Sequence, residues 1–172
     1  MTFQYFKDKN GREYLGRVFL IEPEEVEYKS KTKGSSKRKP NLTYEELEQS
    51  AEENGCLDIY ETLFKALEDP FYKQTTRSSV SFKAEIDGGN KSVFNLIPTE
   101  SSSEKGLKFQ IYKYRISQLL DITQEELRES LPSNIEDWIY YDSAPEEYEG
   151  YEGYFENSEQ VETFLNKVKK EI

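Results

Sequence analysis

A chain of 172 residues is long enough for one domain with a hydrophobic core and a small appendage, and it is short for two full domains. It has no His and one Cys, which excludes Ser/His/Asp and Cys/His nucleophile systems, an intrachain disulfide and Cys-rich metal sites. The net charge is −11 and only 35% of the residues are hydrophobic, yet 13 Tyr, 10 Phe and one Trp supply the large apolar surfaces that a disordered chain lacks. We therefore expect a folded protein that uses no transition metal and no cofactor.

The sequence shows neither a targeting segment nor a membrane segment. The first 30 residues lack the basic, apolar and cleavage regions of a signal peptide, which favours a cytoplasmic location. The longest apolar runs, such as residues 18–21 and 94–97, are far short of the roughly 20 residues that cross a bilayer. We expect no contact with a membrane.

Charge is divided between the two ends of the chain. Residues 1–40 hold 10 of the 23 Lys and Arg against 6 acids, which leaves a balance of −15 for residues 41–172. A basic arm on an acidic body can bind a polyanion, an acidic surface of a partner or its own body. The charges alone leave all three possibilities open.

Residues 1–21 have the pattern of a β-hairpin. Aromatic and aliphatic residues flank Lys9-Asn10-Gly11, and Asn-Gly favours the two positive φ angles of a type I′ turn. Residues 22–41 then form a charged linker, first acidic and then basic, whose self-repulsion and lack of apolar residues keep such a segment extended.

Residues 42–68 predict two consecutive helices. Thr43 and Glu46 have the spacing of a capping box, and Gly55 should end the helix that this box begins. Asp58 and Glu61 repeat the signature, and apolar residues at helical spacing follow up to residue 67.

Residues 80–112 change to the period of a sheet. Apolar and polar side chains alternate over residues 80–86 and again over 107–111, and Asp-Gly-Gly-Asn at 87–90 turns the chain into a return strand at 91–97. This pattern predicts a three-stranded antiparallel meander.

The remaining residues predict further elements around this sheet. Thr123 and Glu126 form another capping box, residues 137–141 and 150–156 are candidate strands, and Ser158 is expected to cap a final helix. The fold is therefore predicted as α+β: an antiparallel β-meander with helices on one face in a domain at 42–172, plus an N-terminal β-hairpin on a basic linker.

One candidate site lies at an edge of the meander, where hydroxyl and cationic side chains of two loops should meet. They can bind a phosphate or another anion, although Ser and Thr are also ordinary turn formers. The residues of this hypothetical anion site are Thr75, Arg77, Ser79, Ser101, Ser102 and Lys105.

Two nucleic-acid hypotheses carry less weight. Lys83, Lys108 and Tyr112 share the outer face of the predicted sheet, but few rings there could stack a base, so a solvated face is the simpler interpretation. Glu27 and Lys29 have the Glu-x-Lys spacing of some magnesium nucleases, a spacing that is common by chance in so acidic a chain.

A second candidate site joins the basic linker to the acidic, Tyr-rich C-terminal third. Rings that alternate with acids can dock a basic partner, or can imitate DNA, although such rings also serve as core. The predicted partner-binding residues are Lys29, Lys31, Lys33, Lys37, Arg38, Lys39, Trp138, Tyr148, Tyr151 and Tyr154.

The sequence thus favours a non-catalytic interaction module inside the cell that binds a protein or nucleoprotein partner. The alternatives are a protein or enzyme that binds a phosphate or nucleotide through Arg77 and Lys105, and an acidic DNA-mimic inhibitor. Nucleic acid remains a possible partner of the basic linker.

The charge division predicts the behaviour of a variant that lacks residues 1–40. If the linker folds back on the acidic body, the truncated protein should lose stability more at low salt than at high salt, because salt screens the attraction. Thermal melts at two ionic strengths measure this. If the linker binds nucleic acid instead, affinity should fall steeply between about 50 and 200 mM salt and vanish on truncation.

Overall fold

The computed structural model describes residues 2–7, 13–18 and 39–171, and it divides the chain into two compact units, Met1–Lys39 and Pro40–Ile172. In the first unit, β1 (Thr2–Lys7) and β2 (Glu13–Val18) pair antiparallel, with Thr2 opposite Val18. The predicted hairpin is present. Its turn at Lys9-Asn10-Gly11 and the linker from 22 to 38 lie outside the described residues.

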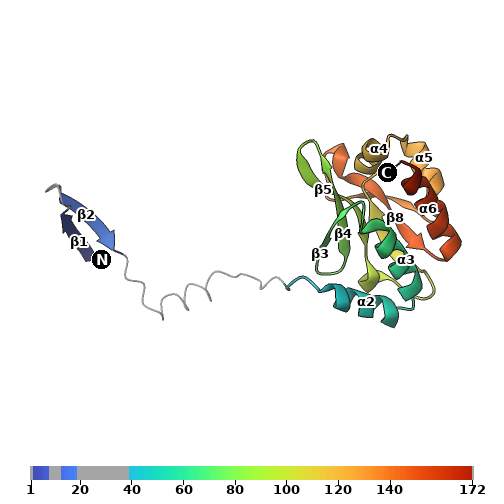
Figure 1. The fold of residues 1–172 in the computed structure, drawn as a ribbon, viewed down its shortest axis with the longest axis horizontal. Coiled ribbons are helices and arrows are strands. Elements are labelled where there is room, and N and C mark those ends of the chain that lie inside the picture. The colour runs from blue at the N-terminus through green and yellow to red at the C-terminus, as the bar shows by residue number, and fades with distance from the viewer. Residues whose placement is uncertain (1, 8–12, 19–38, 172) are drawn as a thin grey trace. The chain divides into compact units, whose positions relative to one another are not determined.

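The second unit is built on a six-stranded antiparallel sheet (Figure 1). Its strand order is β3-β4-β5-β6-β8-β7, so β3 and β7 form the two edges. The strands are β3 (Tyr72–Thr75), β4 (Val80–Ile86), β5 (Gly89–Leu96), β6 (Leu107–Ile111), β7 (Glu136–Ile139) and β8 (Glu149–Phe155).

Five helices pack their apolar side chains into one core against this sheet. They are α2 (Tyr44–Glu53), α3 (Leu57–Leu67), α4 (Lys113–Leu120), α5 (Gln124–Ser130) and α6 (Ser158–Glu171), and two short 3-10 turns, η1 (Pro98–Glu100) and η2 (Glu146–Tyr148), complete the domain. The predicted α+β fold class is confirmed.

Four of the buried side chains of the core are phenylalanine rings that strand alternation places on one face of the sheet. Phe82, Phe94, Phe109 and Phe155 come from four neighbouring strands and are all at most 1% exposed. Phe164 of α6 stacks on Phe94 with ring centroids 5.3 Å apart. Burial of each such ring contributes about 1.5–3 kcal/mol, so these rings fix the helices on the sheet.

Local signals explain where several elements begin and end. The capping boxes of Thr43 and Thr123 are both formed: the amides of Glu46 and Glu126 donate to the threonine hydroxyls at 3.2 and 3.1 Å. Gly55 follows α2 with φ of +70°, a conformation that glycine adopts without strain.

Two predicted caps are wrong. Helix α3 begins at Leu57, one residue before Asp58, and its N-cap Cys56 makes no side-chain capping bond. Ser158 lies inside α6, where Asn157 caps instead, because its Oδ1 accepts from the amide of Gln160 at 3.1 Å. The cap thus lies two residues earlier than the signature suggested in α3, and one residue earlier in α6.

Gly150 of β8 allows a close approach of the backbone of the neighbouring strand β6. A Cβ at this position would lie 1.9 Å from the carbonyl oxygen of Ile111 and 3.3 Å from the ring of Trp138. Because backbone cannot move aside cheaply, Gly150→Ala should lower the free energy of unfolding by about 1–3 kcal/mol. Gly89→Ala is the matched control, since nothing lies within 4 Å of its Cβ. Urea denaturation of both variants measures the free energy of unfolding. Equal midpoints for Gly150→Ala and Gly89→Ala would contradict the close approach.

Candidate functional site

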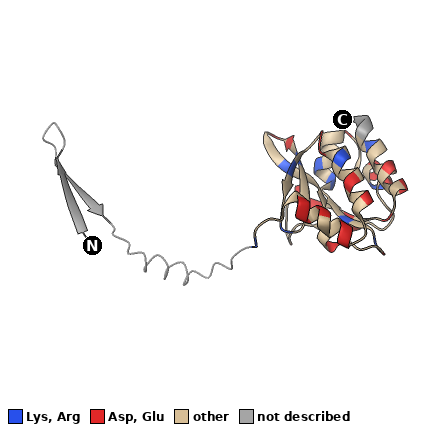
Figure 2. Ribbon diagram, turned by 60° about the horizontal axis from the view of Figure 1, so that its bottom comes forward, with Lys and Arg blue, Asp and Glu red and all other residues tan. Residues whose placement is uncertain are grey.

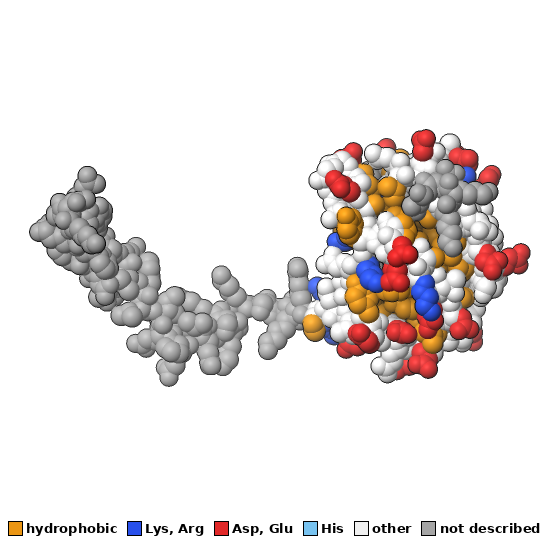
Figure 3. Space-filling model, in the orientation of Figure 1, with side chains coloured by type: hydrophobic (Ala, Val, Ile, Leu, Met, Phe, Trp, Pro, Cys, Tyr) orange, Lys and Arg blue, Asp and Glu red, His pale blue; other side chains and the backbone are white. Residues whose placement is uncertain are grey.

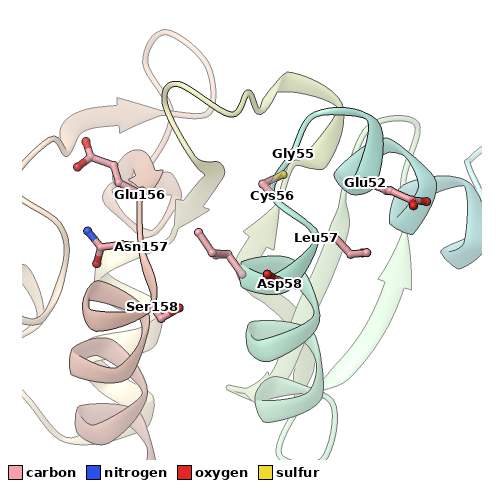
Figure 4. A pocket seen from close by; sticks show the side chains of 9 residues that line it. Glu52, Gly55, Cys56, Leu57, Asp58, Glu156, Asn157 and Ser158 are labelled. Atoms are coloured by element: carbon pink, nitrogen blue, oxygen red, sulfur yellow. The ribbon is translucent and has the colours of Figure 1, made fainter.

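A hollow of about 470 Å³ lies between the start of α3 and the start of α6 (Figure 4). Three acids line it: Glu52, Asp58 and Glu156. Figure 4 shows Glu52 and Glu156 on opposite sides, with side chains that do not converge on a common point. The carboxylates repel an anion at the two helix starts, and their separation gives no cation a shared set of ligands.

The thiol in this hollow is not activated. Cys56 is buried, and this burial raises the pKa of its thiol, so the thiolate is disfavoured. Its Sγ lies 3.5 Å from the carbonyl oxygen of Ala51, and the chain has no His to act as a base. The hollow therefore lacks the arrangement that nucleophilic catalysis requires.

The two loops of the predicted anion site are neighbours, because the hydroxyl of Thr99 donates to the carbonyl of Ser78 at 3.0 Å. Arg77 is exposed at this edge, whereas the ammonium of Lys105 lies over the ring of Tyr154 at 5.7 Å. Neither residue lines the hollow between α3 and α6.

Most hydroxyls of this predicted site are engaged inside their own loops. Ser79 and Thr76 share a hydrogen bond of 2.8 Å. Ser101 donates to Ile97 and accepts from the amide of Lys108, both at 2.8 Å, and Ser102 accepts from the amide of Lys105. Thr75 accepts through its carbonyl from Asn41. The hydroxyls thus stabilise the turns, and binding of an anion by Arg77 and Lys105 stays a prediction.

A row of rings at the β7 edge forms the strongest candidate for a binding surface. We call Tyr112, Trp138, Tyr140, Tyr141 and Tyr148 the aromatic patch. Successive ring centroids lie 5.2 to 6.1 Å apart, from Tyr112 through Trp138 and Tyr140 to Tyr141 and Tyr148. Tyr140 and Tyr141 are 60% and 50% exposed, and Ile139 beside them is 43% exposed. Exposed apolar side chains that adjoin one another in this way are typical of interaction surfaces.

Arg115 of α4 holds one end of the patch in place. Its guanidinium lies between the rings of Tyr112 and Tyr148, 4.4 and 4.5 Å from their centroids, and donates to the carbonyl of Ser92 at 2.9 Å. Only 6% of the residue is exposed. The planar cation stacks on both rings, so Tyr148 has one fixed position relative to the sheet.

The loop between β7 and β8 is also held by its own backbone. The amide of Tyr140 donates to the carbonyl of Tyr148 at 3.2 Å, and the amide of Tyr148 donates to that of Pro145 at 2.8 Å. The exposed rings are therefore carried by a closed loop rather than by a free segment.

The surroundings of the patch are acidic. Residues 136–149 contain six acids and no Lys or Arg. Lys113 and Lys91 pair with Glu149 and Glu147, each at 2.9 Å. Among residues 39–168, three of the six acids have no ion-pair partner: Glu136, Asp142 and Glu146. Figure 2 shows that Asp and Glu, in red, are frequent over the whole domain. The patch thus lies in a negative field.

The remaining predicted partner-binding residues are divided between core and surface. Tyr151 is 5% exposed and belongs to the core, so this ring serves in packing, which was the alternative to partner binding. Tyr154 is half-buried on β8, and Lys39 is exposed. The other predicted linker cations, 29–38, lie outside the described residues. The list of predicted partner-binding residues did not include Tyr140 and Tyr141, although these rings belong to the same run of alternating tyrosines and acids as Tyr148.

No protein-family model, curated protein or solved structure matches this chain. Within the part of the chain that the structure describes, no helix is long and apolar enough to cross a membrane. The same residues contain no group of three or more Cys, Asp or Glu arranged to hold a metal ion.

The role of Arg115 predicts the effect of a conservative change. Arg115→Lys keeps the charge but loses the planar stacking on two rings, so the free energy of unfolding should fall by about 1.5–3 kcal/mol. Arg128→Lys is the control, because Arg128 is exposed and its guanidinium lies over one ring only, that of Tyr151 at 5.4 Å. Thermal melting with near-UV circular dichroism reports both. Equal effects of the two substitutions would show that the stacked position has no special importance.

Proposed function

We propose that this protein is a non-catalytic interaction module that binds a basic, partly apolar polypeptide segment through the aromatic patch. The observation that carries the proposal is the exposure of Ile139, Tyr140 and Tyr141 side by side at the edge of a folded domain. Tyrosine supplies large contact area with few rotatable bonds, so it is common among residues that dominate binding energy.

The anchoring of the patch supports the same proposal. A surface that is already ordered loses little conformational entropy on binding, and the closed loop and the stacked Arg115 provide that order. Loose rings on a mobile loop would bind more weakly for the same contact area.

The charge of the surroundings selects the partner. Carboxylates without ion-pair partners around the rings attract Lys and Arg of a partner and repel nucleic acid and acidic proteins. In this proposal the basic linker acts separately, on a different part of the partner or on the body itself. An acidic DNA mimic is the alternative, and it would depend on the carboxylates rather than on the rings.

Selection of a random peptide library on the full chain tests the proposal. The enriched peptides should combine Lys or Arg with aromatic or aliphatic residues. The double substitution Tyr140→Ala, Tyr141→Ala should raise their Kd about tenfold or more, since both rings lie at the centre of the surface. Tyr72→Ala is the matched control, because Tyr72 is 63% exposed on the opposite edge strand. None of these changes alters the net charge.

Two results would overturn the proposal. The first is equal binding of the selected peptides to the wild-type chain and to the double variant. The second is a loss of binding on Glu136→Gln and Glu146→Gln with no effect of the tyrosine substitutions, which would favour the DNA mimic.

A further inference from the structure

A second, smaller pocket lies on the helical side of the domain, between α2 and α3. It has a volume of about 240 Å³, and its walls include the rings of Tyr44, Tyr60 and Phe64. The Phe64 ring lies 5.8 Å from that of Tyr44, edge to face, and 5.7 Å from that of Tyr60. Figure 3 shows apolar side chains next to acidic and basic ones on the face where α3 lies. This pocket is too small for most cofactors and has room for one side chain.

The hydroxyl of Tyr60 is a buried polar group without a partner. The residue is 3% exposed, and its Oη makes no hydrogen bond within the described part of the chain. Burial, with added repulsion from Glu48, raises the pKa of this phenol, so it stays neutral. Glu48 and Tyr44, whose effects reach this oxygen, both line the pocket. A buried hydroxyl without a partner costs about 1–3 kcal/mol, and a ligand N–H that donates to its oxygen would reduce that cost.

One of the carboxylates that line the pocket has no cation to balance its charge. Glu48, Glu61 and Glu68 line it together with a single cation, Lys65. Lys65 pairs with Glu61 at 2.8 Å, and Glu68 pairs with Lys73. Within residues 39–168, Glu48 has no ion-pair partner. The pocket therefore has an uncompensated negative charge beside three rings.

The same rings already contact an ammonium group of this chain. Nζ of Lys73 lies 4.8 Å from the ring centroid of Phe64 and 5.6 Å from that of Tyr44. Lys73 is not one of the residues that line the pocket, and Glu68 balances its charge. Its position shows that the rings of Phe64 and Tyr44 can contact a cation.

We propose that the pocket between α2 and α3 binds one cationic side chain of a partner, a Lys or an Arg, on the rings of Tyr44, Tyr60 and Phe64 with Glu48 as counter-ion. The N–H donors of these two side chains suit the free hydroxyl of Tyr60, which a quaternary ammonium could not satisfy. The surface is separate from the aromatic patch, because the residues that line the pocket belong to α2, α3 and the residue after α3, and none of them is part of the patch.

The experiment uses Nα-acetyl-lysine methylamide and Nα-acetyl-arginine methylamide as probes, with the norleucine analogue as neutral control. Aromatic NMR signals of Tyr44, Tyr60 and Phe64 in the full chain are followed during titration. The cationic probes should shift these signals, and the norleucine analogue should not. Comparison of the two cations identifies which side chain the pocket prefers.

Substitutions separate the pocket from the general negative field of the domain. Glu48→Gln should weaken probe binding about threefold to tenfold, whereas Glu53→Gln, at an exposed position of the same helix, should change it little. Tyr60→Phe should also weaken binding and leave the melting temperature unchanged or raised, since it removes a buried hydroxyl without a partner. This combination distinguishes a binding role from a merely structural one.

The proposal fails if norleucine methylamide gives the same shifts, or if Glu48→Gln and Glu53→Gln weaken binding equally. The variant Tyr140→Ala, Tyr141→Ala should bind the lysine probe like the wild-type chain. If it does, the two losses of binding report different surfaces: loss of peptide binding in that variant reports the aromatic patch, and loss of probe binding in Glu48→Gln reports the pocket. If it loses probe binding, the signals report the aromatic patch and the pocket assignment is wrong.

Discussion

Contact between phenylalanine rings joins the four inner strands of the sheet to α3. Phe64 of α3 meets Phe82, and the series continues through Phe94 and Phe109 to Phe155, with centroid distances from 4.5 to 6.4 Å. Because these rings belong to four strands and a helix, a shift of one strand by a single residue would turn its ring out of the core. Strand register and helix position are therefore fixed together.

This ring contact also connects the core to the proposed cation pocket. Phe64 packs on Phe82 of the core, with ring centroids 6.0 Å apart, and also lines the pocket. The rings of the pocket are thus held by the same packing that stabilises the fold, and their geometry needs no ligand to form. At the other edge of the sheet, Arg115 plays the corresponding role for Tyr148 by stacking between two rings.

The regular parts of the fold could be predicted from the sequence because their signals are local. Strict alternation identified β4 and β6, and the capping boxes of Thr43 and Thr123 identified α2 and α5. Strand β3 was missed, since Tyr72–Thr75 pairs only along one side and three of its four residues are exposed, which leaves no apolar alternation to detect. Helix α4 was missed because it has neither a capping side chain nor an acid in its first turn.

The candidate sites were harder to predict because they depend on contacts distant in the sequence. The serines that suggested an anion site turned out to bond within their own loops, which spacing alone could not reveal. The cation pocket joins Tyr44 of one helix to Tyr60 and Phe64 of the next, and only the packing of α2 on α3 brings these rings together. The anchoring of Tyr148 likewise depends on Arg115, 33 positions earlier in the chain.

The antiparallel order of the sheet places its two edge strands as far apart as six strands allow. Five interstrand spacings of about 4.8 Å separate β3 from β7, a width of about 24 Å. An extended polypeptide covers that width with about seven residues. A single partner molecule would have to span at least this width to contact both edge strands at once. The second contact would then form at millimolar effective concentration, so two individually weak contacts would together bind the partner more tightly than either one alone.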